Sequence, residues 1–215
     1  MLDLSFQNTV MARPREFDRD TALQRAIETF AQHGFEGTST PMLLDAMKIG
    51  RQSLYDTFGD KRALYLEALR RYSDDSVGAT LTAMFAHANV LQGIQQALLA
   101  FAQTASTPHG TACLGIHAVA EFGTTADDVS GVTHAVGERT LLAFESRLRD
   151  GIGRGEIAAT LDPAAGAQFL LATLSGLKIA ARGGAPHAVL TQIIAVAMRS
   201  LAPEIVDYVV QKGVA

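Results

Sequence analysis

Between residues 40 and 61, residues that begin and end helices follow one another so closely that only short helices fit. Thr40-Pro41 combines a good N-cap with a proline suited to the first helical position, which predicts a helix ending near Met47. Ile49-Gly50 predicts a turn, and Arg51–Phe58 a second short helix that Gly59 ends. Two short helices joined by a tight turn and packed on a longer preceding helix form a helix-turn-helix.

The rest of the chain also has helical periodicity and lacks the period-2 alternation of strands. The preceding long helix is expected to start after Asp18 and stop at Gly34, and Asp60 is expected to cap a fourth helix. Further helices are expected at residues 79–88, 91–105, 111–122, 126–153, 162–182 and 187–201, with a short tail helix near 203–212. Loops are expected at 107–110, 153–155, 162–163 and 183–186.

These patterns predict an all-α protein with two parts. Residues 13–60 would form an N-terminal three-helix DNA-binding domain containing the helix-turn-helix. Residues 61–215 would form a C-terminal helical domain, with the border inside the long fourth helix. Since Met11 could itself start translation, we expect residues 1–12 to be a disordered extension.

Composition excludes several classes of protein. The net charge is −4, yet acidic and basic residues balance through residue 72, where arginines cluster at Arg13, Arg15 and Arg19. One cysteine, Cys113, excludes a disulfide framework. No unbroken run of eighteen apolar residues and no secretory signal is present, so we expect a cytoplasmic protein without a membrane span. Without a nucleophile elbow, a zinc-protease motif, a phosphate loop or a dinucleotide turn, neither an enzyme nor a cofactor is expected. A helical adaptor module is the other rival class.

The stretch Phe17–Tyr65 resembles the TetR/AcrR family of bacterial repressors. The residues that carry the resemblance are Ala26, Phe30, Gly34, Phe35, Thr38-Ser39-Thr40, Leu44, Gly50-Arg51-Gln52-Ser53-Leu54-Tyr55, Phe58, Lys61 and Ala63-Leu64-Tyr65. The resemblance implies a homodimer that represses transcription from a palindromic double-stranded operator and is released by a small-molecule effector. It also implies that the helical domain of residues 61–215 binds the effector and dimerises. Activation in place of repression stays an alternative.

The resemblance also implies roles for single residues. It makes Thr40, Tyr55 and Lys61 the residues that contact DNA phosphates. Base edges would be read by Arg51, Gln52 and Ser53, with Arg51 suited to guanine and Gln52 to adenine. Asp56 and Thr57 depart from the aromatic and histidine often found at these positions. Asp56 would repel phosphates but could accept a hydrogen bond from a cytosine amino group.

The predicted 111–122 helix suggests a sensor around Cys113 and His117. It is similar to a segment in one branch of the family, where a cysteine senses electrophiles or oxidants. Cys113 near a helix N-terminus, with His109 or His117 nearby, could be a reactive thiol, whereas a small buried residue is the commoner role of a free cysteine. Cys113, His117 and Glu121 also lie at i, i+4 and i+8, which leaves metal sensing as an alternative, although no metal site is predicted.

Aromatic residues are the other candidates for the effector pocket, and they would suit a hydrophobic or planar effector. They are Phe85, Phe101, Phe122, Phe144 and Phe169, with Met84. The helices at 126–153 and 162–182 are the predicted dimer interface, because the second carries many small residues that allow close approach in a four-helix bundle.

Overall fold

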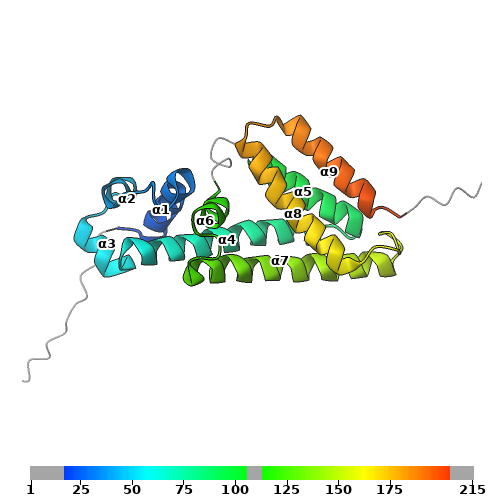
Figure 1. The fold of residues 1–215 in the computed structure, drawn as a ribbon, viewed down its shortest axis with the longest axis horizontal. Coiled ribbons are helices and arrows are strands. Elements are labelled where there is room, and N and C mark those ends of the chain that lie inside the picture. The colour runs from blue at the N-terminus through cyan, green and yellow to red at the C-terminus, as the bar shows by residue number, and fades with distance from the viewer. Residues whose placement is uncertain (1–16, 106–112, 204–215) are drawn as a thin grey trace, which may run out of the picture.

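The computed structural model describes residues 17–105 and 113–203, and in these ranges all regular secondary structure is helical, which confirms the all-α prediction. The helices are α1 (Arg19–His33), α2 (Thr40–Met47), α3 (Arg51–Phe58), α4 (Lys61–Phe85), α5 (Val90–Ala105), α6 (Leu114–Phe122), α7 (Asp127–Gly153), α8 (Pro163–Arg182) and α9 (His187–Leu201). In Figure 1, α1–α3 lie at one end, α5, α8 and α9 at the other, and α4 and α7 run between them.

The caps of the first helices follow the local sequence signals, with one correction. Asp18 accepts a hydrogen bond from the Thr21 amide at 2.6 Å, and Gly34 ends α1 with a positive φ of 73°. Ser39, not the predicted Thr40, is the N-cap of α2, because its hydroxyl accepts from the Met42 amide at 3.3 Å. Thr40 is therefore the first residue of the helix.

The fourth helix corrects the predicted helix at 79–88, which is the C-terminal part of one continuous α4. The serines, aspartates and glycine between residues 73 and 78 suggested a break. In the structure Ser73 is buried, Arg71 pairs with Asp75 one turn on, and Asp74 accepts a hydrogen bond from Arg139 of α7 at 2.7 Å. Tertiary contacts thus hold the helix across residues of weak helical propensity.

Two hydrophobic cores meet along α4. The N-terminal core joins α1–α3 to Leu64, Tyr65, Ala68 and Leu69 of α4, and it also takes in residues of α6 and α7. The C-terminal core joins Met84 to α5, α7, α8 and α9. The border between the cores therefore falls within α4, and α6 packs in the N-terminal core although it lies far along the chain.

Helix α8 is long and apolar enough, by length and composition alone, to cross a membrane, with a mean hydropathy of 1.3 in its most apolar window. The sequence expectation of no membrane span rested on unbroken apolar runs, and α8 passes a window criterion because it carries only Lys178 and Arg182 as charged residues. A core helix passes the same criterion, and α8 gives Leu170, Leu174 and Leu177 to the C-terminal core.

Several sequence predictions lie outside the described residues. They are the extension at 1–12, Arg13 and Arg15, the loop at 107–110 with His109, the first residues of the predicted 111–122 helix, and nearly all of the tail helix at 203–212.

Candidate DNA-binding surface

Helix α3 presents one apolar and one polar face, as expected of a recognition helix. Leu54 and Phe58 are buried against the N-terminal core. On the opposite face Arg51, Gln52 and Asp56 are exposed, and the Tyr55 side chain is 45% exposed. Ser53 and Thr57 are half-buried at the edges. All six predicted contact residues of α3 thus retain solvent access, as contact with DNA would require.

Two of the predicted base-reading residues bind each other. The Gln52 side-chain amide donates a hydrogen bond to the Asp56 carboxylate at 2.8 Å, one turn further along α3. The pair holds Gln52 in one orientation and leaves its Oε1 free to accept. An adenine read bidentately needs the oxygen and one amide hydrogen of Gln52, and the second amide hydrogen can keep the bond to Asp56.

The turn between α2 and α3 is made by Lys48, Ile49 and Gly50. Lys48 has a φ of 57°, the one positive φ of a non-glycine residue in ranges 17–105 and 113–203. Its backbone amide donates to the Leu44 carbonyl and closes α2. This left-handed residue turns the chain sharply enough for α3 to start three residues later, at Arg51.

Two of the three predicted phosphate-binding residues, Thr40 and Lys61, stand at helix starts, whereas Tyr55 lies inside α3. Thr40 is the first residue of α2 and Lys61 the first of α4, and both are half-buried. The Lys61 ammonium lies 4.2 Å from the ring centroid of Phe35. Helix N-termini offer free amides and a positive dipole end, so both positions suit a phosphate.

Most other arginines near this surface already have acidic partners. Arg19 pairs with Glu67 at 2.7 Å and its guanidinium lies over the Phe58 ring. Arg62 makes two hydrogen bonds to Asp128 of α7, at 3.0 and 2.6 Å, and these hold the pKa of the Asp128 carboxyl below its usual range. Within the described residues no carboxylate pairs with Arg51, so its charge is available for DNA.

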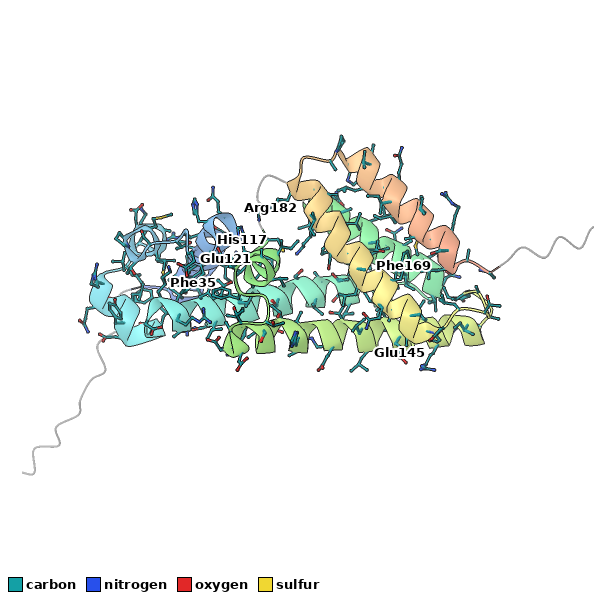
Figure 2. All side chains as sticks on the ribbon, in the orientation of Figure 1. Phe35, His117, Glu121, Glu145, Phe169 and Arg182 are labelled. Atoms are coloured by element: carbon teal, nitrogen blue, oxygen red, sulfur yellow. The ribbon has the colours of Figure 1, made fainter. Side chains whose placement is uncertain are left out.

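Helix α6 joins the DNA-binding part to the rest of the molecule. The Phe35 amide donates a hydrogen bond to the Glu121 carboxylate at 2.8 Å, and a Cβ on Gly34 would collide with the same carboxylate. The rings of Phe35, Tyr65 and Phe122 pack with centroids 5.0 to 5.7 Å apart. Figure 2 shows Phe35, His117 and Glu121 together where α6 meets the end of α1.

Burial lowers the pKa of His117, and the nearby charge of Arg182 lowers it further, whereas Glu121 opposes both effects. Among the described residues, the buried Nε2 of His117 has no hydrogen-bond partner. His117 is thus favoured as a neutral imidazole in the α6 joint.

The predicted sensor residue Cys113 is buried at the N-cap of α6. Tyr72 of α4 donates a hydrogen bond to the Cys113 sulfur at 3.4 Å. Lys178 of α8 donates to the Tyr72 hydroxyl at 2.9 Å and lies 4.9 Å from the ring centroid of Phe101. This contact network joins four helices.

The other predicted pocket residues do not gather at one place. Phe144 and Met84 are fully buried in the C-terminal core, whereas Phe85 and Phe169 are 56% and 42% exposed. Phe122 belongs to the N-terminal core, and only Phe101 lies near Cys113. The metal alternative gains no support, because Glu121 accepts from Phe35 and no group of three potential ligands exists in the part of the chain that the structure describes.

Sequence reasoning missed Tyr72, Lys178 and Arg182 as partners of the sensor region. A signal was present: Lys178 and Arg182 are the only charges in an otherwise apolar helix. The tertiary contact from Lys178 to Tyr72 spans 106 residues and cannot be read from helical periodicity.

Comparisons with known proteins agree with this geometry. The family described as "Bacterial regulatory proteins, tetR family" matches residues 22–68. The HTH-type transcriptional repressor ComR of Escherichia coli K12 is 33% identical over 201 residues, which cover 90% of this chain and 93% of ComR. YezE of Bacillus subtilis 168, an uncharacterized HTH-type transcriptional regulator, is 44% identical over 85 residues, 40% of this chain and 44% of YezE.

Among solved structures, a cysteine mutant of the TetR family transcriptional regulator CifR, complexed with a 26-base-pair operator duplex, superposes with a TM-score of 0.79. It is 31% identical, and the match covers 87% of this chain and 99% of that one. The two chains thus share the same helical architecture.

Proposed function

Since this chain belongs to the TetR family of transcriptional regulators, which are non-enzymatic DNA-binding proteins and include named repressors, we propose that it is a cytoplasmic repressor. It binds a palindromic operator as a homodimer. A small molecule bound in the C-terminal domain releases it.

The observation that carries the proposal is the exposed face of α3. Arg51 has no acidic partner among the described residues, and it shares that face with Gln52 and Tyr55. On the opposite face, the buried Leu54 and Phe58 pack α3 against the N-terminal core. A helix of two turns enters the major groove and reads only a few base pairs. A second copy related by a two-fold axis doubles the length of DNA that is read, which explains the need for a dimer.

Helices α8 and α9 provide the surface that we assign to the dimer. Exposed apolar and small residues follow one face of α8 at spacings of three and four: Phe169, Ala172, Gly176 and Ile179. Val189, Ile193 and Val196 do the same on α9. The two helices pack side by side, so two copies would form a four-helix bundle and bury both stripes.

This assignment keeps the predicted helix at 162–182 and replaces the one at 126–153. The outward face of α7 carries mainly charged residues, among them Glu138, Arg139 and Arg149, and its exposed large apolar residue is Leu142. Charged residues are depleted from the cores of stable interfaces.

Release from DNA requires a connection between the effector domain and α3. Helix α6 offers one, because its N-cap residue Cys113 contacts Tyr72 and its C-terminal half contacts Phe35 through Glu121. A ligand that moves α6 or α4 would change the spacing of the two recognition helices in the dimer, and half-sites one DNA turn apart tolerate no such change.

The proposal is tested by selecting duplexes from a random library with the full-length protein. The expected result is an enriched palindrome with half-sites about ten base pairs apart, bound with an affinity that falls steeply with salt. Arg51→Met should relax the preference at one base pair per half-site and cost about 1–3 kcal/mol in binding. Arg149→Met on α7 is the control and should leave binding unchanged. Recovery of no preferred sequence would favour the adaptor class.

A further inference from the structure

Lys178 is a half-buried cation that lies between aromatic rings instead of beside a carboxylate. Its ammonium lies 4.9 Å from the ring centroid of Phe101 and 5.1 Å from that of Tyr72. Within residues 17–105 and 113–203 no carboxylate oxygen comes within ion-pair distance of it. Taking an ammonium partly out of water without an opposite charge is unfavourable, and such a site is suited to an anion that arrives from outside.

The surroundings of Lys178 supply further groups that recognise an anion. The Tyr72 hydroxyl accepts from Lys178 at 2.9 Å and donates to Cys113, a weak acceptor that a carboxylate could replace. Burial raises the pKa of Tyr72 well above its ordinary value, so it remains a neutral donor. Arg182 lies one turn beyond Lys178 on the same face of α8, which brings a second cation to this side of the helix.

The position of these residues suits a ligand that controls the molecule. Tyr72 packs against the N-terminal core and Phe101 against the C-terminal core, so the cluster lies where the two cores meet. The backbones of α4 and α8 make little contact with each other, and long side chains span the distance between them. Sites for small molecules occur preferentially at such borders.

We propose that the Lys178 cluster, defined as Tyr72, Phe101, Cys113 and Lys178, binds the carboxylate of an aromatic acid, with the acid's ring against Phe101. This rests on the proposed function as a ligand-released repressor and names the chemical class of the ligand. The carboxylate takes hydrogen bonds from Lys178 and Tyr72, which frees Tyr72 from Cys113. Because Tyr72 belongs to α4 and Cys113 begins α6, binding changes both helices that lead to the DNA. A neutral hydrophobic ligand would shield the Lys178 ammonium from water without supplying an opposite charge, which is unfavourable.

The test compares acids with neutral amides of the same shape. Calorimetric titration of the full-length protein uses benzoate and 2-naphthoate against benzamide and 2-naphthamide. At least one acid should bind, at least tenfold more tightly than its amide. Lys178→Met should weaken that acid at least tenfold, whereas Lys178→Arg should stay within about threefold, since a charge-assisted hydrogen bond is the interaction at stake. Lys48→Met, the same substitution on the distant α2–α3 turn, should have no effect.

Three outcomes overturn the inference: no acid binds, the amides bind as tightly as the acids, or Lys178→Met binds the acid as tightly as the unmodified protein. Cys113→Ser should keep the affinity for the acid, and loss of binding in this variant alone would assign the site to thiol chemistry instead. Selection of a palindrome without ligand tests the proposed function separately. A repressor that binds its operator but ignores these acids would refute only the ligand class.

Discussion

At the scale of single residues, the sequence predicts which side chains of the helix-turn-helix are buried and which are exposed. Leu54 and Phe58 lie inside as their spacing requires, and Asp18, Gly34, Gly59 and Asp60 mark helix ends as their types predict. The sequence does not reveal which exposed side chains contact each other, because each of them could reach several partners. Lys61 over Phe35 is such a case, since the two residues are 26 positions apart.

The Gln52–Asp56 pair leads to a prediction about DNA recognition. Asp56→Asn keeps an acceptor for the Gln52 amide and removes a negative charge that would face phosphates. Affinity for the selected operator should rise about fivefold, the size of a unit-charge interaction of about 1 kcal/mol at close range in water. Base preference should change at the position nearest Asp56. Fluorescence anisotropy measures the affinity, with Asp75→Asn on α4 as control. Unchanged affinity and preference would mean that Asp56 lies away from the DNA.

The lowered pKa of His117 leads to a prediction about stability. Above the ordinary value of 6.5 the imidazole is neutral in both folded and unfolded protein and contributes no pH dependence. Below it the unfolded chain binds a proton that the folded protein resists, so stability falls as the pH drops from 7 toward 5. Urea denaturation across this range should show a smaller fall for His117→Gln than for the unmodified protein. Equal falls would contradict the lowered pKa.

At the scale of elements, nearly every helix could be predicted, and the continuous α4 could not. Eight of the nine helices in the described ranges begin and end within a few residues of the predicted positions, because caps, prolines and glycines are local signals. Arg139 of α7 binds Asp74 in the middle of α4, a contact that no local pattern contains. The packing of α6 against α1 also cannot be predicted from local sequence patterns, since Glu121 and Phe35 are 86 residues apart.

The contact between α6 and α1 can be tested by its hydrogen bond. Glu121→Ala removes the acceptor of the Phe35 amide, and Glu121→Gln retains one. The alanine variant should lose about 1 kcal/mol in its free energy of unfolding, typical of a partly exposed hydrogen bond, and the glutamine variant less. Amide exchange provides the site-specific readout: the Phe35 amide should exchange faster in Glu121→Ala and stay protected in Glu121→Gln. Equal protection in both variants would show that α6 does not anchor α1.

At the scale of the whole molecule, sequence patterns predicted a dimer but named one helix that the structure makes less suitable. Several of the small residues that suggested α8 are exposed, whereas the exposed large apolar residue of α7 is Leu142. The exposed apolar residues of α9 show helical spacing in the sequence. The sequence does not reveal which side of α9 faces α5 and α8, so an exposed apolar stripe looks the same as a buried one.

The assignment of the interface predicts opposite results for two kinds of variant. Ile179→Asp on α8 and Val196→Asp on α9 place charges in the proposed bundle and should convert dimers to monomers in sedimentation experiments. Leu142→Asp on α7 changes an equally exposed apolar residue and should leave the dimer intact. Circular dichroism checks that all three variants keep their helices. A dimer that survives Ile179→Asp and is lost with Leu142→Asp would restore α7 as the interface.

Because α4 is one unbroken helix, a small rotation at one of its ends becomes a larger displacement at the other. Its 25 residues make a rod about 37 Å long at about 1.5 Å per residue, anchored in one core at each end. A swing of about 5° at the Met84 end carries the Lys61 end through about 3 Å, close to the rise of roughly 3.4 Å between stacked base pairs on one strand. A rearrangement no larger than one side chain can therefore displace the reading helix by a whole step of the double helix. With a flexible joint in the middle of α4, rotation of the Met84 end would no longer displace the Lys61 end.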